Sequence, residues 1–115
     1  MAQICTTREQ SKRLLELGIS RETADMFYPI GASFPEECDN GDSMQADHPA
    51  WSLGALISVI PEMIEHKYTF QLTHFGVYYC DYDNDAIHGA EGVDVFKNCI
   101  NMIEWLVKKK YIKTK

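Results

Sequence analysis

The chain has 115 residues, of which 45% are hydrophobic and 24% are charged, with a formal net charge of -6. This length fits one domain with a real core, and the composition excludes a disordered chain. All 17 acidic side chains lie in residues 1–107 whereas five of the lysines lie in the last eight residues, so the acidic body argues against a broad nucleic-acid-binding surface.

The first predicted element is a helical hairpin over residues 7–28. Its first helix covers residues 7–17, because Thr6 offers a cap with Glu9 three residues further on. Gly18 then suits the position just after a helix end.

The second helix of this hairpin is capped by Ser20 and runs to Tyr28, where Pro29 stops it. Residues 30–48 follow as a long acidic loop without helical or strand periodicity. Loops of this length are uncommon and often functional, so this loop is a candidate interaction surface, the alternative being a solvated excursion with one or two short extended pieces. Its candidate residues are Glu36, Glu37, Asp39 and Asp42.

A broken helix is predicted over residues 52–65. Ser52 is its cap, and Pro61 breaks it because proline cannot continue the hydrogen-bond ladder from within. A short helical turn from Pro61 to Glu65 completes this element. Trp51, just before the cap, is expected to fold back onto the first turns.

A β-hairpin is predicted over residues 67–81. Tyr68, Phe70 and Leu72 alternate with polar residues, which is the period-two pattern of a half-buried strand. A second β-rich run follows the turn. Two strands are seldom stable without a cover, so the last helix must supply it.

That helix is predicted over residues 91–110, where one apolar stripe recurs at helical spacing. Val95, Met102 and Trp105 widen the apolar arc beyond what one hairpin can cover, so either other helices pack on its second side or a second copy of the protein does. We expect a mixture of the two, and hence a homodimer with Trp105 as an interaction residue. The elements together predict an α+β fold in one domain over 1–115: a small helical N-terminal half, and one antiparallel β-hairpin covered by a long C-terminal helix.

The acidic stretch after the hairpin raises the question of a metal site, with Asp81, Asp83 and Asp85 as the candidate ligands. Alternating aspartates are typical of the front half of a calcium loop. Counted from Asp81, however, the sixth position is Ala86 and the twelfth is Gly92, so the glycine and the closing glutamate of an EF-hand are missing. The acidic side chains are better interpreted as the solvated exit from the hairpin.

Other catalytic patterns have little local support. Cys80, with His74 and Asp81 near it in the sequence, is the one candidate enzyme site, but neighbouring negative charge disfavours the thiolate that a nucleophile needs. No GxSxG, HExxH, GxGxxG or P-loop motif occurs, and we expect no cofactor. No apolar run approaches the roughly 18 residues of a membrane span and the start lacks a signal-peptide pattern, so we expect a cytoplasmic protein without a membrane partner.

The phrases "TTREQSKRLLELGISRETADM" and "HPAWSLGALISVIPEMIE", with the closing "EWLVKKK", resemble a set of small uncharacterised proteins of gut Bacteroides-type bacteria and their phages or mobile elements. The resemblance covers most of the chain and involves cap, helix and packing residues. It implies an α+β architecture and such an origin, but no activity.

These observations leave three hypotheses for the function. The first is a small non-enzymatic protein-interaction factor, encoded by a phage or mobile element. The second is an acidic inhibitor or nucleic-acid mimic that uses the carboxylates of residues 36–47 and 81–94. The third is a small enzyme with a site at Cys80, His74 and Asp81, which would require a pocket with convergent polar groups.

Overall fold

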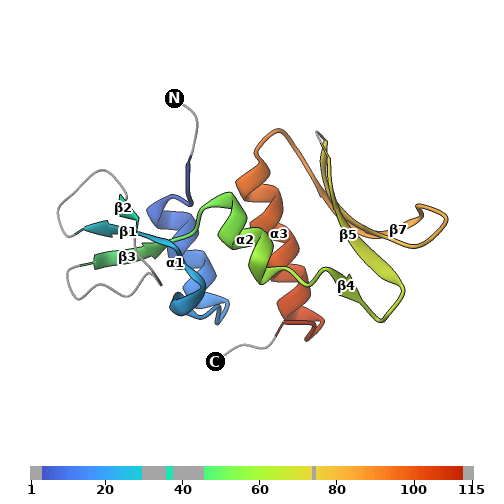
Figure 1. Cartoon of the computed structure of the whole chain (residues 1–115), viewed down its shortest axis with the longest axis horizontal. Helices are drawn as coiled ribbons and strands as arrows, with labels where there is room; N and C mark the ends of the chain where they lie inside the picture. Colours follow the sequence, from blue (N-terminus) through green and yellow to red (C-terminus); the bar gives the residue numbers. More distant parts are fainter. Residues whose placement is uncertain (1–3, 30–35, 38–45, 74, 113–115) are drawn as a thin grey trace. The chain divides into compact units, whose positions relative to one another are not determined.

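A computed structural model describes residues 4–29, 36–37, 46–73 and 75–112 (Figure 1). Contacts group the chain into two compact units, the first ending at Val59 and the second beginning at Ile60. Both units combine helix with antiparallel sheet, which confirms the α+β class. The prediction of one domain stays a prediction.

The first helix, α1 (Arg8–Glu16), confirms the predicted element but begins at a different cap. Thr7 is the N-cap, and it forms a capping box with Gln10, whose side chain accepts the Thr7 backbone N–H at 3.0 Å. Thr6 serves another purpose, because its buried hydroxyl accepts the backbone N–H of Trp51 at 3.0 Å. The predicted cap was therefore wrong by one residue.

The predicted second helix is wrong beyond its first turn. Ser20 caps only a single 3-10 turn, η1 (Arg21–Thr23), and Ala24 already has an extended backbone. The strand β1 (Met26–Pro29) follows in place of the helix. Pairing with strands distant in the sequence decides this conformation, and such pairing leaves no mark in the local periodicity.

Two short strands occupy the described parts of the predicted acidic loop. β2 (Glu36–Glu37) and β3 (Ala46–Ala50) both pair antiparallel with β1, in the order β2-β1-β3. The candidate interaction residues Glu36 and Glu37 therefore lie in a strand rather than in a loop, whereas Asp39 and Asp42 lie outside the described residues.

The predicted broken helix over 52–65 is correct only in its first half. α2 (Leu53–Val59) ends before Pro61, as predicted, but the helical turn expected after the break is the strand β4 (Met63–Ile64). Glu65 and His66 then both adopt positive φ angles, 53° and 56°, which form the tight turn that leads back into the next strand.

The second unit is built on a four-stranded antiparallel sheet in the order β4-β5-β6-β7. β5 (Tyr68–Leu72) and β6 (Gly76–Cys80) confirm the predicted hairpin over 67–81. β7 (Ala86–Glu91) was not predicted, and it adds an edge strand to the hairpin.

The last helix, α3 (Val95–Lys108), starts four residues later than predicted because β7 occupies the residues before it. Gly92, at φ 153°, ends the strand, and Asp94 caps the helix by accepting the Lys97 backbone N–H at 3.2 Å. α3 contacts β6 and β7, which confirms that the C-terminal helix covers the sheet (Figure 1).

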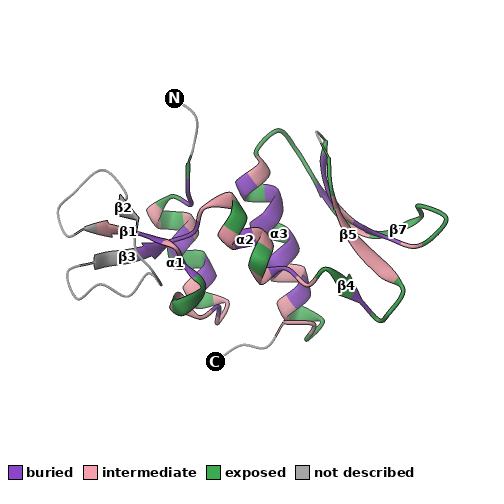
Figure 2. Cartoon of the chain, viewed as in Figure 1, coloured by how far each residue is buried: buried purple, intermediate pink, exposed green. Residues whose placement is uncertain are grey.

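The core of the second unit lies between α3 and one face of the sheet (Figure 2). Tyr79 is fully buried on this face, and the cross-strand partners Phe70 and His88 lie on the same side. Met102 is also fully buried within the single chain, so its burial requires no second copy. The apolar arc of α3 therefore no longer argues for a homodimer at Met102.

Asp25 provides a test of the first unit, because its carboxylate holds the start of α2. One oxygen accepts the Ser52 backbone N–H at 2.8 Å and the other accepts the Ser52 hydroxyl. We predict that Asp25→Ala lowers the free energy of unfolding by about 1–2 kcal/mol, as removal of a helix cap does. Urea denaturation measures this, with the exposed Glu22→Ala as control at less than about 0.5 kcal/mol. Equal losses in the two variants would contradict the assignment.

Candidate functional site

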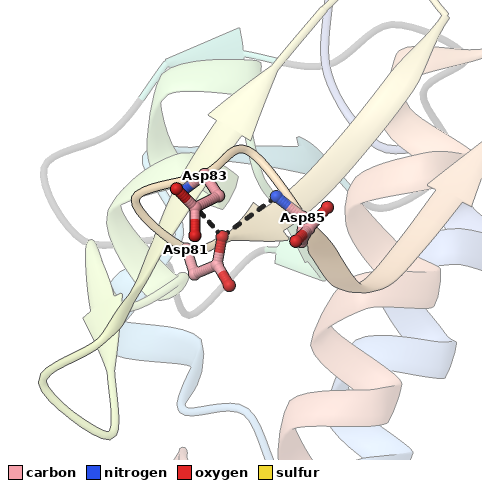
Figure 3. A group of neighbouring side chains, drawn as sticks. All are labelled: Asp81, Asp83 and Asp85. Atoms are coloured by element: carbon pink, nitrogen blue, oxygen red, sulfur yellow. Dashed lines mark hydrogen bonds between the residues drawn. The ribbon is translucent and has the colours of Figure 1, made fainter.

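The turn between β6 and β7 brings the three candidate metal ligands together (Figure 3). Asp81, Asp83 and Asp85 each offer a carboxylate oxygen, and these oxygens lie within 4.8 Å of one another. One oxygen of Asp81 also accepts the backbone N–H groups of Asp83 and Asp85, at 2.9 and 3.0 Å. The first aspartate therefore shapes the turn.

This geometry gives the first aspartate, Asp81, a role without a metal ion, because aspartate side chains commonly close turns by accepting nearby backbone N–H groups. The turn connects two strands, which excludes the helix–loop–helix frame of an EF-hand. The three carboxylates still have the hard oxygen chemistry that divalent cations prefer. Asp81, Asp83 and Asp85 stay candidate ligands on that chemistry alone.

A hollow of about 280 Å³ lies beside this turn, on the sheet face that points away from α3. Cys80 and Asp81 both line it, together with Lys67, Thr69 and Tyr82. Two members of the candidate enzyme site thus meet at one depression, while His74 lies outside the described residues. The enzyme hypothesis stays a prediction.

A second hollow, of about 350 Å³, lies between β7 and α3, and we call it the β7–α3 groove. The strand contributes His88, Gly89 and Ala90. The helix contributes Asn101, Glu104, Trp105 and Lys108. The groove therefore contains Trp105, the one interaction candidate whose side chain the structure describes.

Aromatic rings form the base of this groove. His88 stacks on Trp105 with ring centroids 4.3 Å apart and planes 4° from parallel. Trp105 also contacts Tyr79 at 6.2 Å and Tyr111 at 5.8 Å. These three ring contacts hold the Trp105 side chain in place. Because Trp105 is only partly buried, it still borders the groove.

The cluster also determines the protonation of its members. Burial, and then the positive charge of Lys109, lower the pKa of His88, which keeps the imidazole neutral at neutral pH. Burial raises the pKa of Tyr79, so its hydroxyl stays protonated and donates to the Pro61 carbonyl. His88 and Tyr79 are thus both neutral, and the charged side chains near the groove are the lysines of α3 and Glu104. Glu104 pairs with Lys108 at 3.7 Å.

The groove is bordered by a free strand edge, since β7 is the last strand of its sheet among the residues that the structure describes. The Gly92 N–H donates to the Phe75 carbonyl at 3.1 Å, and the register pairs Ala90 with Val77. In an antiparallel pair such bonds alternate along the strand. The backbone groups of Gly89 and Glu91 therefore point away from β6 and toward the open side.

Sequence reasoning missed the strand side of this groove entirely. The only local signal for this strand was that His88 and Ala90 lie two residues apart after a turn, as residues on one face of a strand do. The segment contains too few apolar side chains for this spacing to predict a strand. On the helix side, Asn101 and Lys108 lie seven residues apart on one stripe, and the helical period predicts that they share a face.

No protein-family model, curated protein or solved structure matches this chain. No helix within the described residues has both the length and the hydrophobicity that crossing a bilayer requires.

We predict that acidification below about pH 6.5 destabilises the protein through His88. Since the folded-state pKa lies below the unfolded value, the unfolded state binds the proton first, and the stabilisation present above pH 6.5 is lost as the pH falls through the folded pKa. Urea unfolding across this range should show a smaller pH slope for His88→Asn than for wild type. Lys109→Gln removes the nearby positive charge but leaves His88 buried, so it should reduce the pH slope by less than His88→Asn does. Equal slopes in wild type and His88→Asn would refute the prediction.

The thiols of Cys80 and Cys99 are expected to differ in reactivity. Cys80 is 8% exposed and borders a hollow, whereas Cys99 is 0% exposed and its burial raises the pKa of its thiol to about 11. At pH 8 only roughly one Cys99 in a thousand would be a thiolate. Iodoacetamide labelling of the native Cys38→Ser variant, mapped by mass spectrometry, should modify Cys80 well before Cys99. Unfolding in urea should make the two rates similar, and equal rates in the native state would contradict the structure.

Proposed function

We propose that this chain is a small non-enzymatic protein-interaction factor that binds its partner in the β7–α3 groove. The observation that carries the proposal is the free edge of β7 beside the half-buried Trp105. Protein-binding surfaces favour large aromatic side chains that are held in place before binding, because little side-chain entropy is then lost. The sequence resemblance implies an origin in a phage or mobile element, and an accessory role there is part of the proposal.

The groove is better suited to a segment of a protein than to a small molecule. A hollow of about 350 Å³ is at the lower end of small-molecule pockets, and it is open along the strand. Its lining alternates aromatic, amide and charged groups, which matches the mixed chemistry of protein interfaces. Within the described residues, the groove holds no nucleophile beside a base.

The acidic-mimic hypothesis has one specific observation in its favour. The carboxylates of Asp81, Asp83 and Asp85 form a compact negative cluster, and Tyr82 between them is 92% exposed. A basic protein surface could bind this turn. The two hypotheses place the partner at different positions, so they can be separated.

Photo-crosslinking separates them. A benzoyl-phenylalanine at position 101, in the groove, should capture a reproducible partner in cells of the native host, whereas the same group in place of Tyr82 should not. Asn101 is exposed on α3, so the replacement leaves the core intact. Capture from position 82 alone, and in a salt-sensitive manner, would replace the proposal by the acidic mimic. Capture from neither position would refute it.

A further inference from the structure

We infer that the β7–α3 groove binds an extended, acidic segment of a partner protein, which adds to β7 as a fifth strand of the sheet. The inference rests on the proposed function and specifies the chemistry of the partner. Three features of the groove carry it: the free backbone of β7, the depth set by α3 and the sign of the nearby charge.

The free backbone of β7 provides the pairing surface. Gly89 and Glu91 direct their N–H and C=O groups away from β6, and β7 ends the sheet on this side. Such an edge pairs readily with an extended chain, because each main-chain bond replaces one made to water while the strand stays in place. Addition of a strand here requires no rearrangement of β6.

The helix makes this edge selective. His88 and Ala90 point toward α3, because their cross-strand partners Tyr79 and Val77 are buried beneath it. A strand added about 4.8 Å beyond β7 would therefore direct every second side chain into the groove, toward Trp105 and Asn101. An apolar side chain at these positions would cover the exposed part of the His88–Trp105 stack.

The charged side chains that line the groove, Glu104 and Lys108, pair with each other, so the excess positive charge near the groove comes from Lys97 and Lys109, although the chain as a whole is acidic. Lys97 lies one helical turn before Asn101 on the same stripe, and both Lys97 and Lys108 are exposed. Lys109 lies near enough to His88 to affect its titration, and Glu104 is the acidic side chain that lines the groove. Glu91 projects from the opposite face of the sheet. Charge complementarity therefore favours glutamate or aspartate in the bound segment.

The same charges disfavour a second copy of this chain as the occupant. In a two-fold pair whose β7 strands run antiparallel, both α3 helices would lie on the same face of the joined sheet. Their stripes with Lys97 and Lys108 would then face each other across the seam. Like charges brought together in this way oppose association, whereas an acidic strand would neutralise them.

Binding of three fluorescein-labelled, capped octapeptides tests the inference by fluorescence anisotropy. One peptide alternates glutamate with valine, the second alternates lysine with valine, and the third has proline in place of each valine of the first. The glutamate–valine peptide should bind at least about tenfold more tightly than the other two, because only it combines the charge with the capacity to pair. Stronger binding of the lysine peptide, or equal binding of the proline peptide, would overturn the inference.

Two pairs of variants locate the binding. Glu91→Pro removes an outward N–H that Glu91→Ala retains, and Lys97→Glu reverses a charge that Lys97→Arg retains. In each pair the first variant should bind the glutamate–valine peptide at least about tenfold more weakly than the second. Equal affinity of Glu91→Pro and Glu91→Ala would refute strand addition.

Hydrogen exchange of the wild-type protein provides a readout that does not depend on the folding of any variant. The amides of Gly89 and Glu91 should exchange quickly in the free protein and slowly with the peptide bound, while the Ala90 amide, which points to β6, should be protected in both. Unchanged exchange at Gly89 and Glu91 would overturn the inference.

The crosslinking result separates failure of this inference from failure of the proposed function. If crosslinking at position 101 captures a partner while the peptide and exchange tests fail, only strand addition is wrong. If position 101 captures nothing, the proposed function is wrong as well. A crosslinked pair of identical chains from position 101 would replace the acidic segment by a second copy.

Discussion

Burial of Tyr79 between the sheet and α3 is the contact on which the second unit depends. Its ring meets Phe70 at 5.7 Å and Trp105 at 6.2 Å, and its hydroxyl donates to the Pro61 carbonyl. Burying an aromatic side chain contributes about 1.5–3 kcal/mol, and each favourable ring pair adds about 0.5–1.5 kcal/mol. This contact holds α3 over β6 and β7. As a consequence, Trp105 reaches His88, and the outer edge of β7 stays beyond the cover of the helix.

Two glycines allow β7 to join the sheet at all. A Cβ atom at Gly76 would lie 2.4 Å from the Ala90 carbonyl oxygen, and one at Gly89 would lie 2.5 Å from the Tyr78 ring. Both distances are too short for any side chain, because backbone and ring occupy the space. β7 itself carries few residues with high strand propensity, so its position depends on this close approach to β6 and on the contact of His88 with Trp105. The edge strand is thus defined by its neighbours rather than by its own sequence.

This dependence explains which parts of the structure could be predicted from the sequence. The apolar stripe of α3 and the alternation in β5 arise from local periodicity, and both elements were predicted. β7 was missed because the reason for Gly89 becomes visible only when Tyr78 lies against it, and β1 was predicted as helix because its strand partners are distant in the sequence.

In the candidate site, too, local features were predictable and contacts between distant residues were not. Trp105 was selected for a dimer face, whereas its contact with His88 depends on a strand that the periodicity does not reveal. The three aspartates were noted at once, but the role of the first in closing the turn follows only from the strand after it.

The position of Lys97 separates the two explanations of the positive charge on α3. Lys108 and Lys109 lie at the C-terminal end of the helix, where lysine favourably opposes the negative end of the helix dipole, so their presence needs no ligand. Lys97 lies in the first turn, where the same dipole disfavours a positive side chain by about 0.3–1 kcal/mol. Asp94, which accepts the Lys97 backbone N–H, offsets part of this cost as the helix cap. Helix stability thus accounts for Lys108 and Lys109 at the C-terminal end of α3, but not for Lys97 at its N-terminal end. An anionic segment lying along β7 would contact both ends.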